Sequence, residues 1–339
     1  MKIEIADFSP KAENSRSTEI LYVGTPDFIP DTTVSLARLL DAPSQIPIIY
    51  ATLCDQYMDL IRTIKRAAPD QDLCLFSIGQ QDATFEQLDL LDDPLYEALQ
   101  TEIAGIPRFN FPVPTQGLRR TITPKDLVTQ IGEHTFVAPS LAEEIMGFED
   151  TGFIASHLGE GGMLLHENGI VLLSDMFNDP LTTEHVGLLE ETGQKVGYLP
   201  QGNPEDFPES MRCYPEGHID HFSFLSMVGD QHKLYLPSTY YENHQSAITE
   251  IQGSLGLSVE IISDNNLPAQ AFNVRKLPNG NLVCIGVDKN GNSSNLFIEA
   301  LTKNFGDKVF ATGDTNFLTS VMRAGPSCFT NPLSFRFTL

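Results

Sequence analysis

Apolar and polar positions divide the second half of the chain into a recurring unit of strand, strand, helix and strand. GMLLHENGIVLLSD places two apolar runs around an Asn-Gly turn, which predicts a β-hairpin. A helix from Leu181 to Gly193 and a strand at KVGYL follow it. The same order returns from HFSFLSMVGDQHKLYLP and again from AFNVRKLPNGNLVCIG. A period of about fifty to sixty residues predicts a repeat or propeller architecture, with an ordinary α+β domain as the alternative.

The first half of the chain has the same kinds of element in a less regular order. Three apolar segments rich in β-branched residues are expected to form strands. They are ILYV (Ile20 to Val23), IPIIYA and LCLFSI. CDQYMDLIRTIKRAAP has apolar residues at helical spacing. DDPLYEALQTEIAG has a cap, a proline start and a glycine stop, which together predict a helix. We therefore expect one α/β domain covering residues 1–339.

Composition excludes some classes of binding partner and favours one cellular compartment. The net charge of −24 argues against a nucleic-acid-binding or anionic-membrane-binding protein, and no apolar run is long enough to span a bilayer. The N-terminus lacks the apolar core of a secretory signal. The five cysteines are irregularly spaced and form no CxxC pair, so neither a disulfide framework nor a zinc ribbon is expected. These features favour a cytoplasmic protein with free thiols, and export without a cleaved signal would also fit them.

Three polar clusters precede or interrupt the apolar runs of the repeats. They are GEGGM with Glu160, EGHIDHF with His218 and Asp220, and AGPSCFT with Cys328. On a strand, residues two apart point to the same face, so His218 and Asp220 are expected to serve one site. His221 would then fall on the opposite face, and we expect no metal site shared by these residues.

A cysteine, a histidine and several carboxylates together favour nucleophilic catalysis on a cation. The thiol must be ionised to attack, and a histidine can pass protons to and from the leaving group. Carboxylates around a thiolate repel most electrophiles, but they would bind a guanidinium group through its fork of N–H donors. The bound cation also favours the thiolate form of the cysteine.

These motifs resemble the guanidino-group modifying enzymes of the pentein fold, which include arginine and agmatine deiminases, dimethylarginine hydrolases, peptidylarginine deiminases and amidinotransferases. LGEGGMLLHENG is similar to the E-G-G strand of that family, GHIDHFSFL to its H-x-D strand, and AGPSCFTNPL to its C-terminal cysteine segment. TPKDLVTQIGEHTFVAP is similar to the segment that carries the first acid, which points to Asp126. The resemblance covers residues 110–339 and implies five strand-strand-helix-strand blades around a central channel.

The resemblance implies a role for each site residue. Cys328 would attack the guanidinium carbon and form a covalent amidino intermediate. His218 would protonate the departing amine and then activate water. Asp126 and Asp220 would hold the guanidinium nitrogens, and Glu160 would orient or charge His218. The implied substrate is a small guanidino cation or arginine in a protein, and the implied enzyme needs neither cofactor nor metal.

Several readings stay open. The implied reaction is hydrolysis of the deiminase or dihydrolase type, with amidino transfer to a second amine and a non-catalytic pentein-fold binding protein as alternatives. The chain departs from the family pattern at Lys125 and Met163 and contains no tryptophan, so the rest of the substrate is undetermined. One of three arginines near the motifs is a candidate to bind a substrate carboxylate: Arg212, Arg275 or Arg323.

Overall fold

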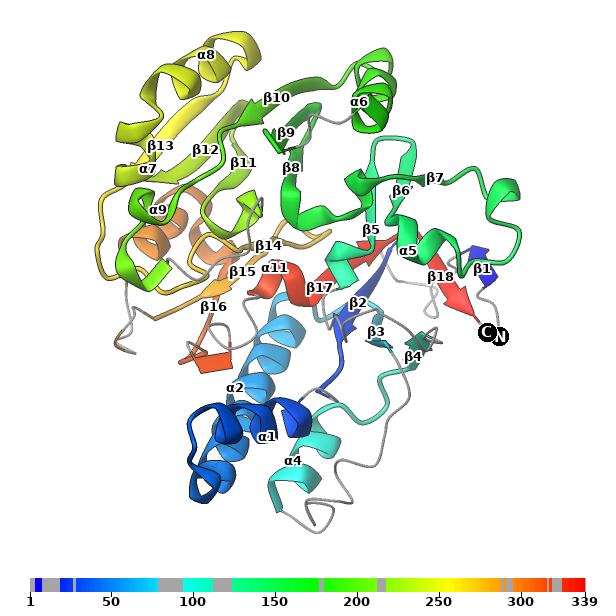
Figure 1. Ribbon diagram of the computed structural model, residues 1–339, viewed down its shortest axis with the longest axis vertical. Helices are drawn as coiled ribbons and strands as arrows, with labels where there is room; N and C mark the ends of the chain where they lie inside the picture. Colours follow the sequence, from blue (N-terminus) through cyan, green and yellow to red (C-terminus); the bar gives the residue numbers. More distant parts are fainter. Residues whose placement is uncertain are drawn as a thin grey trace.

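The computed structural model describes residues 4–7, 19–26, 29–78, 94–111, 124–176, 180–211, 218–287, 290, 295–315, 317–318 and 325–338. Within these residues the chain forms five sheets of three or four strands, one two-stranded sheet, and helices that connect the strands (Figure 1). The α/β class predicted from the sequence is therefore confirmed.

Four of the sheets repeat one pairing pattern along the chain. In each, the first two strands form an antiparallel pair, and the third strand runs parallel to the second. The strands are β5 (Val128–Ile131), β6 (His134–Val137) and β7 (Ile154–Ala155); β8 (Leu164–Glu167), β9 (Ile170–Ser174) and β10 (Lys195–Leu199); β11 (Phe224–Val228), β12 (Gln231–Pro237) and β13 (Ser258–Ile262); and β14 (Arg275–Lys276), β15 (Leu282–Ile285) and β16 (Val309–Thr312). The hairpin of β8 and β9 turns at Asn168 and Gly169, whose φ angles of 42° and 86° are those that an Asn-Gly turn favours.

Helices make the crossovers that parallel strands require. In each of these sheets they follow the second strand and precede the third. They are α5 (Pro139–Ala142), α6 (Pro180–Glu191), α7 (Ser238–Asn243), α8 (Gln245–Leu255) and α9 (Leu296–Phe305). In α8, Ile248, Ile251 and Leu255 recur at helical spacing and are buried, so this helix packs one apolar face on the protein.

The fifth sheet joins the two ends of the chain. β17 (Thr330–Leu333) pairs antiparallel with β2 (Ile20–Gly24), and β3 (Leu73–Ile78) and β4 (Arg108–Phe111) follow in parallel. β1 (Glu4–Asp7) pairs with β18 (Phe335–Thr338) in the two-stranded sheet. The antiparallel-then-parallel pattern of the other sheets therefore recurs here, built from strands more than 300 positions apart in the sequence.

One element of the first half differs from the sequence prediction. IPIIYA is not a strand but the start of α2 (Ile46–Ala67), which also contains the helix predicted after it. Its buried residues, among them Ile49, Leu53 and Tyr57, recur every three or four positions. Pro47 occupies the first turn, where a missing N–H costs no helical hydrogen bond. Helices α1 (Ile29–Leu39) and α4 (Pro94–Glu102) lie beside α2.

Short helices and 3₁₀ turns make many of the connections between the longer elements. The 3₁₀ turns are η2 (Pro43–Gln45), η3 (Pro124–Asp126), η4 (Phe148–Asp150), η5 (His157–Gly159), η6 (Gly161–Met163), η7 (Pro204–Asp206), η8 (Glu209–Met211), η9 (Ile219–His221) and η10 (Gly306–Lys308). The last helix is α11 (Pro326–Phe329). In Figure 1 this short red helix lies near the centre, with sheets on several sides of it. A propeller closed around a central channel is a finer arrangement and stays a prediction.

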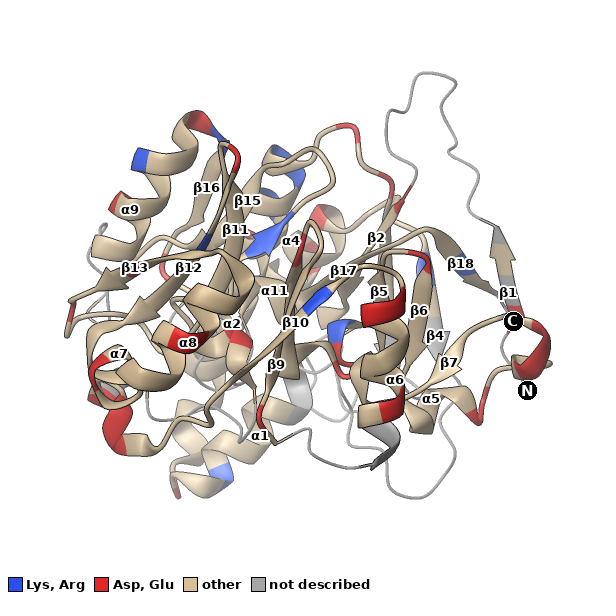
Figure 2. Ribbon diagram, turned by 90° about the horizontal axis from the view of Figure 1, so that it is seen from above, with Lys and Arg blue, Asp and Glu red and all other residues tan. Residues whose placement is uncertain are grey.

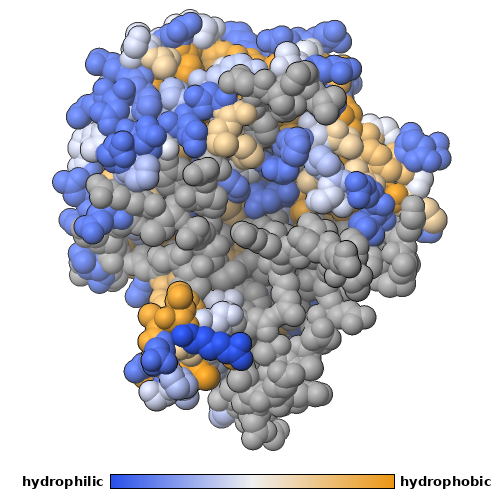
Figure 3. Space-filling model, viewed as in Figure 1, coloured by the Kyte–Doolittle hydropathy of each residue, from blue (hydrophilic) through white to orange (hydrophobic). Residues whose placement is uncertain are grey.

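The outer surface carries the acidic charge of the sequence. Figure 2 shows acidic segments distributed over many helices and connections. Apolar side chains are exposed near the end of α1 and the start of α2, at Leu39, Leu40 and Ile48, where Figure 3 shows an orange area. Among the described residues, none of the helices combines the length and apolar character that crossing a membrane requires.

Candidate active site

Cys328 lies inside α11 and is 1% exposed. The Gly325-Pro326 pair starts this four-residue helix. Gly325 is needed because a Cβ at this position would come within 2.7 Å of the Asn273 side chain. The glycine thus allows Asn273 to pack directly against the start of the cysteine helix.

Arg275 holds the cysteine helix from β14. Its guanidinium donates to the Ser327 carbonyl at 2.5 Å, to the Thr330 carbonyl and to the Thr330 hydroxyl at 2.9 Å. Burial lowers the pKa of Arg275 to about 10, against the opposing charges of Cys328, Asp220 and Glu19. Because its donors face backbone carbonyls, Arg275 serves the local fold. The two other candidates for binding a substrate carboxylate, Arg212 and Arg323, lie outside the described residues.

Asn273 joins the cysteine to the acid of the H-x-D motif. Its Nδ2 donates to Cys328 Sγ at 3.1 Å and to Asp220 Oδ2 at 2.8 Å. Its Oδ1 accepts from the Cys328 backbone N–H at 3.1 Å. The thiol itself lies 3.7 Å from Asp220 Oδ2. One buried amide therefore fixes both the position of the sulfur and its separation from a carboxylate.

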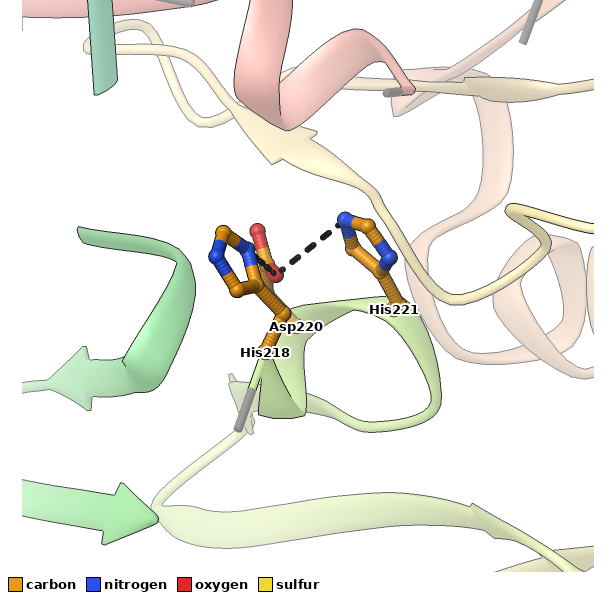
Figure 4. A group of neighbouring side chains, drawn as sticks. All are labelled: His218, Asp220 and His221. Atoms are coloured by element: carbon orange, nitrogen blue, oxygen red, sulfur yellow. Dashed lines mark ion pairs between the residues drawn. The ribbon is translucent and has the colours of Figure 1, made fainter. Parts of the chain in front are cut away.

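The H-I-D-H segment is a 3₁₀ turn, η9, and not part of a strand; β11 begins three residues later. Because a 3₁₀ turn has three residues per revolution, its first and fourth side chains share one side. His218 and His221 consequently both approach Asp220, at 4.0 Å and 3.7 Å from Oδ1 (Figure 4). The expectation that His221 faces away was wrong. Ile219, between the two histidines, is buried.

Two glycines of the E-G-G motif bring this turn and the preceding acid segment together. A Cβ on Gly162 would lie 2.1 Å from His218 Nδ1, and one on Gly161 would lie 2.7 Å from the Lys125 carbonyl. The motif therefore has a packing reason: only hydrogen at these positions lets η6 touch both η3 and η9.

Lys125 supplies the cation nearest to Asp220. Its Nζ lies 2.6 Å from Asp220 Oδ2, and both side chains are largely buried. Burial alone would raise the pKa of Asp220, but Lys125, His221 and His218 outweigh it and hold that pKa below its ordinary value. Asp220 is therefore a carboxylate at neutral pH. Its Oδ1 has no hydrogen-bond partner among the described residues.

The surroundings of Cys328 keep its sulfur protonated in the free protein. Burial raises the pKa of the thiol well above its usual range, and the charges of Asp220 and Asp126 raise it further. Lys125 and the backbone at Gly325 act in the opposite direction and are weaker. An added cation at this point would therefore lower the pKa of the thiol.

The two remaining predicted site residues, Asp126 and Glu160, have different surroundings. Asp126, in η3, is close enough for its charge to act on the Cys328 thiol. Glu160 is more exposed, and its carboxylate bonds His157 Nδ1 at 2.8 Å within its own turn. Its predicted action on His218 stays a prediction.

A metal ion is the other occupant that such residues suggest. His218, Asp220 and His221 each offer a ligand atom, all within 4.8 Å of one another. The Lys125 ammonium already lies against the same carboxylate, however, and it repels a divalent ion more strongly than a singly charged, delocalised cation. The arrangement suits a diffuse organic cation contacting the free Oδ1 better than a compact metal ion.

No family model and no curated protein matches the sequence. Among solved structures, the chain is similar to a cysteine-to-serine variant of DDAH from Pseudomonas aeruginosa complexed with citrulline, with 12% identity and a TM-score of 0.42 over 70% of this chain and 85% of that one. It is also similar to a histidine-to-glycine variant of dimethylarginine dimethylaminohydrolase in an adduct with S-methyl-L-thiocitrulline, with 12% identity, a TM-score of 0.43 and the same coverage. The fold described above rests on this chain's own strand pairing.

Sequence reasoning missed Asn273, Lys125 and His221 as members of the site. Asn273 lies in a segment recognised only as a hairpin, and its contacts depend on β14 lying beside α11. Lys125 was visible as a departure from the family pattern next to Asp126. His221 belongs to the same H-I-D-H motif. The motif was predicted to be a strand, which placed His221 on the face away from Asp220.

Proposed function

We propose that this protein is a guanidino-group hydrolase that works through a covalent amidino intermediate on Cys328. The observation that supports it most is the 3.7 Å separation of Cys328 Sγ from Asp220 Oδ2, two atoms from segments 108 positions apart. Asn273 and Lys125 fix that pair from further segments of the chain. A buried thiol held among carboxylates suits a cationic electrophile.

The free enzyme holds a thiol, and the substrate converts it into a nucleophile. A guanidinium bound beside Asp220 Oδ1 and Asp126 places a positive charge next to the sulfur and lowers the pKa of Cys328. The planar N–H fork matches carboxylate oxygens in two-point fashion. An uncharged substrate would leave the thiol protonated, so the site selects for the cation by reactivity as well as by binding.

The two chemical steps then balance as follows. As the guanidinium binds, the Cys328 thiol passes its proton to His218. The thiolate then forms a C–S bond to the guanidinium carbon, one C–N bond breaks, and His218 gives that proton to the departing amine. Water next attacks the same carbon, His218 takes a proton from it, and the C–S bond breaks to regenerate the cysteine. Asp126 and Asp220 stay ionised throughout, and Glu160 is assigned to positioning His218. No cofactor is needed for either step.

The proposed substrate is a small guanidino compound or arginine in a protein, in a cytoplasmic setting. A screen of arginine, agmatine, methylated arginines, creatine precursors and peptidyl-arginine for release of ammonia or an amine tests the activity. Adding glycine or lysine as an acceptor separates hydrolysis, which releases ammonia and citrulline from arginine, from amidino transfer, which yields ornithine and a new guanidino compound.

A labelling experiment tests the nucleophile. Chloroacetamidine, a cationic alkylating agent, should modify Cys328 and leave Cys54, Cys74 and Cys284 untouched. The Cys328 sulfur lies 3.7 Å from the Asp220 carboxylate, which attracts the cation, whereas the other three thiols pack in the hydrophobic core. Excess substrate should block the labelling, and Cys328→Ser should abolish both labelling and turnover. Full activity in Cys328→Ser, or equal labelling of the buried thiols, would refute the proposal.

A further inference from the structure

His221 places an imidazole nitrogen close to the Cys328 sulfur. Its Nε2 lies 3.6 Å from Cys328 Sγ and 3.7 Å from Asp220 Oδ1, and the residue is 1% exposed. His218, assigned above to proton transfer, is more exposed and lies on the other side of Asp220 Oδ1 (Figure 4). Of the two histidines, His221 is thus buried against the sulfur, whereas His218 is partly exposed to solvent.

His221 is a neutral imidazole at neutral pH. Burial lowers its pKa to about 3; Asp220 opposes this, whereas His218 and Lys125 add to it. A guanidinium in the site would act in the same direction as Lys125. His221 therefore cannot take up the thiol proton and keep it, so it does not act as the base for Cys328.

The single proton of this neutral ring has one favourable position. Nδ1 is buried and has no hydrogen-bond partner among the residues that the structure describes. Nε2 faces a carboxylate oxygen and the sulfur. A proton on Nε2 is stabilised by the Asp220 charge, whereas a proton on Nδ1 would meet no acceptor there. The ring is accordingly an N–H donor directed at the site.

A second neutral donor already points at the same sulfur. Asn273 Nδ2 lies 3.1 Å from Sγ. Ionised sulfur would therefore receive two hydrogen bonds from groups that carry no charge and do not titrate near neutral pH. Such preorganised donors stabilise a developing anion because they need no rearrangement when the charge appears.

We propose that His221 is a catalytic residue that donates an Nε2–H hydrogen bond to the Cys328 thiolate, while His218 alone transfers protons. No proton passes through His221 in either chemical step: the C–S bond forms, the C–N bond breaks, and the departing amine is protonated by His218. The role of the thiolate in turnover rests on the proposed function, but the hydrogen bond to sulfur can be tested without any substrate.

The test compares His221→Phe, which keeps a ring but has no donor, with His221→Gln, whose amide N–H reaches about the same point as Nε2. His232→Phe, on β12 and outside the site, is the control. The pH dependence of Cys328 alkylation by uncharged iodoacetamide gives the pKa of the thiol, with the four other cysteines replaced by serine or alanine. The groups that act on this sulfur are Asp220, Asp126, Lys125, Arg275, the backbone at Gly325 and the two donors, and all except residue 221 stay unchanged.

In His221→Phe, the thiol pKa should rise by about one unit and alkylation at pH 8 should slow about tenfold, as expected for one lost hydrogen bond to an ionised group. His221→Gln should recover most of the loss. Turnover should fall about 10- to 100-fold in kcat in the Phe variant, with KM changed less than about threefold. A thiol pKa in His221→Phe equal to that of His232→Phe would overturn the inference.

Nitrogen NMR of the wild-type protein provides a measurement that does not depend on a variant's folding. The Nε2–H tautomer of neutral His221 is expected, and an Nδ1–H tautomer or an imidazolium would overturn the inference. If alkylation responds to His221 as described but no guanidino compound is turned over, the proposed function fails and the donor role remains. If turnover is found but alkylation is indifferent to residue 221, the donor role fails alone.

Discussion

Asp220 is the residue at which the charges of the site meet. Its Oδ2 receives the Lys125 ammonium at 2.6 Å and the Asn273 amide at 2.8 Å, while the Cys328 thiol lies 3.7 Å from the same atom. A buried carboxylate without a cation would be costly. Lys125, which departs from the family pattern, therefore stabilises the acid that the proposed mechanism needs ionised.

Replacing Lys125 with methionine should destabilise the protein and make the cysteine less acidic. The buried Asp220 charge would lose its partner, which costs about 3 kcal/mol of unfolding free energy at pH 7. The thiol pKa should rise further, because Lys125 is one of the groups that lower it. Urea unfolding and the pH dependence of alkylation measure the two effects.

Two variants control this experiment. Lys125→Arg keeps a cation beside Asp220 and should lose much less stability than the methionine variant. Lys195→Met removes an exposed lysine on β10 and should be nearly neutral. A Lys125→Met protein as stable as Lys195→Met would mean that the ion pair does not support the folded site.

At the scale of elements, the site is made where short turns touch. η6 meets η3 and η9 because its two glycines carry no side chains, and α11 meets Asn273 because of Gly325. These contacts position His218, Lys125 and Cys328 from two 3₁₀ turns and a four-residue helix. The geometry is therefore sensitive to single added methyl groups.

Gly162→Ala is expected to damage the site more than the fold. The new Cβ would lie 2.1 Å from His218 Nδ1, so the ring or the turn must move. Overpacking of this kind costs about 1–3 kcal/mol, and kcat for the guanidino compound found in the screen should fall at least about tenfold. Thermal unfolding and steady-state kinetics measure the two effects.

Gly187→Ala is the matched control because a Cβ there meets nothing within 4 Å on helix α6. Alanine at a helical position reduces the entropy of the unfolded chain, so this variant should be about 0.5–1 kcal/mol more stable and fully active. Full activity in Gly162→Ala would show that the close approach of His218 to η6 is not required.

The elements also show what the sequence could and could not predict. The hairpin of β8 and β9 was predictable because Asn168 and Gly169 suit a tight turn whatever surrounds them. The start of α2 was mistaken for a strand because a short apolar run fits either state. The H-I-D-H segment was mistaken because its 3₁₀ conformation is imposed by packing against η6 and β8, and not by its own residues.

At the scale of the whole molecule, the site depends on the ends of the chain meeting. β17 follows the cysteine helix directly and pairs with β2, so closure of the fifth sheet fixes Cys328 relative to the rest. The recurring order of strand, strand, helix and strand predicted the individual sheets. It did not predict that β17 pairs with β2, because pairing between distant strands leaves no local signal in the sequence. The residue types of the site were therefore predictable, and the contacts of Asn273 and Lys125 were not.

The buried ionisable groups make the stability of the molecule depend on pH. The folded protein holds His221 neutral with a pKa of about 3, whereas an unfolded histidine has a pKa of about 6.5. Between these values the unfolded chain binds a proton that the folded protein excludes. Stability is therefore retained above about pH 6.5 and decreases as the pH falls towards 3.

For His221 alone, this difference amounts to about 2 kcal/mol between pH 7 and pH 5. In His221→Gln the titrating group is gone, so the unfolding free energy should fall by about 2 kcal/mol less than in wild type over that interval. Urea unfolding at pH 7, 6 and 5 gives the slopes, with His232→Gln on β12, outside the site, as the matched control. Comparing slopes removes any constant effect of the substitution. Equal slopes for His221→Gln and wild type would mean that the imidazole takes up its proton in the folded state, and its role as a neutral donor to sulfur would be lost with it.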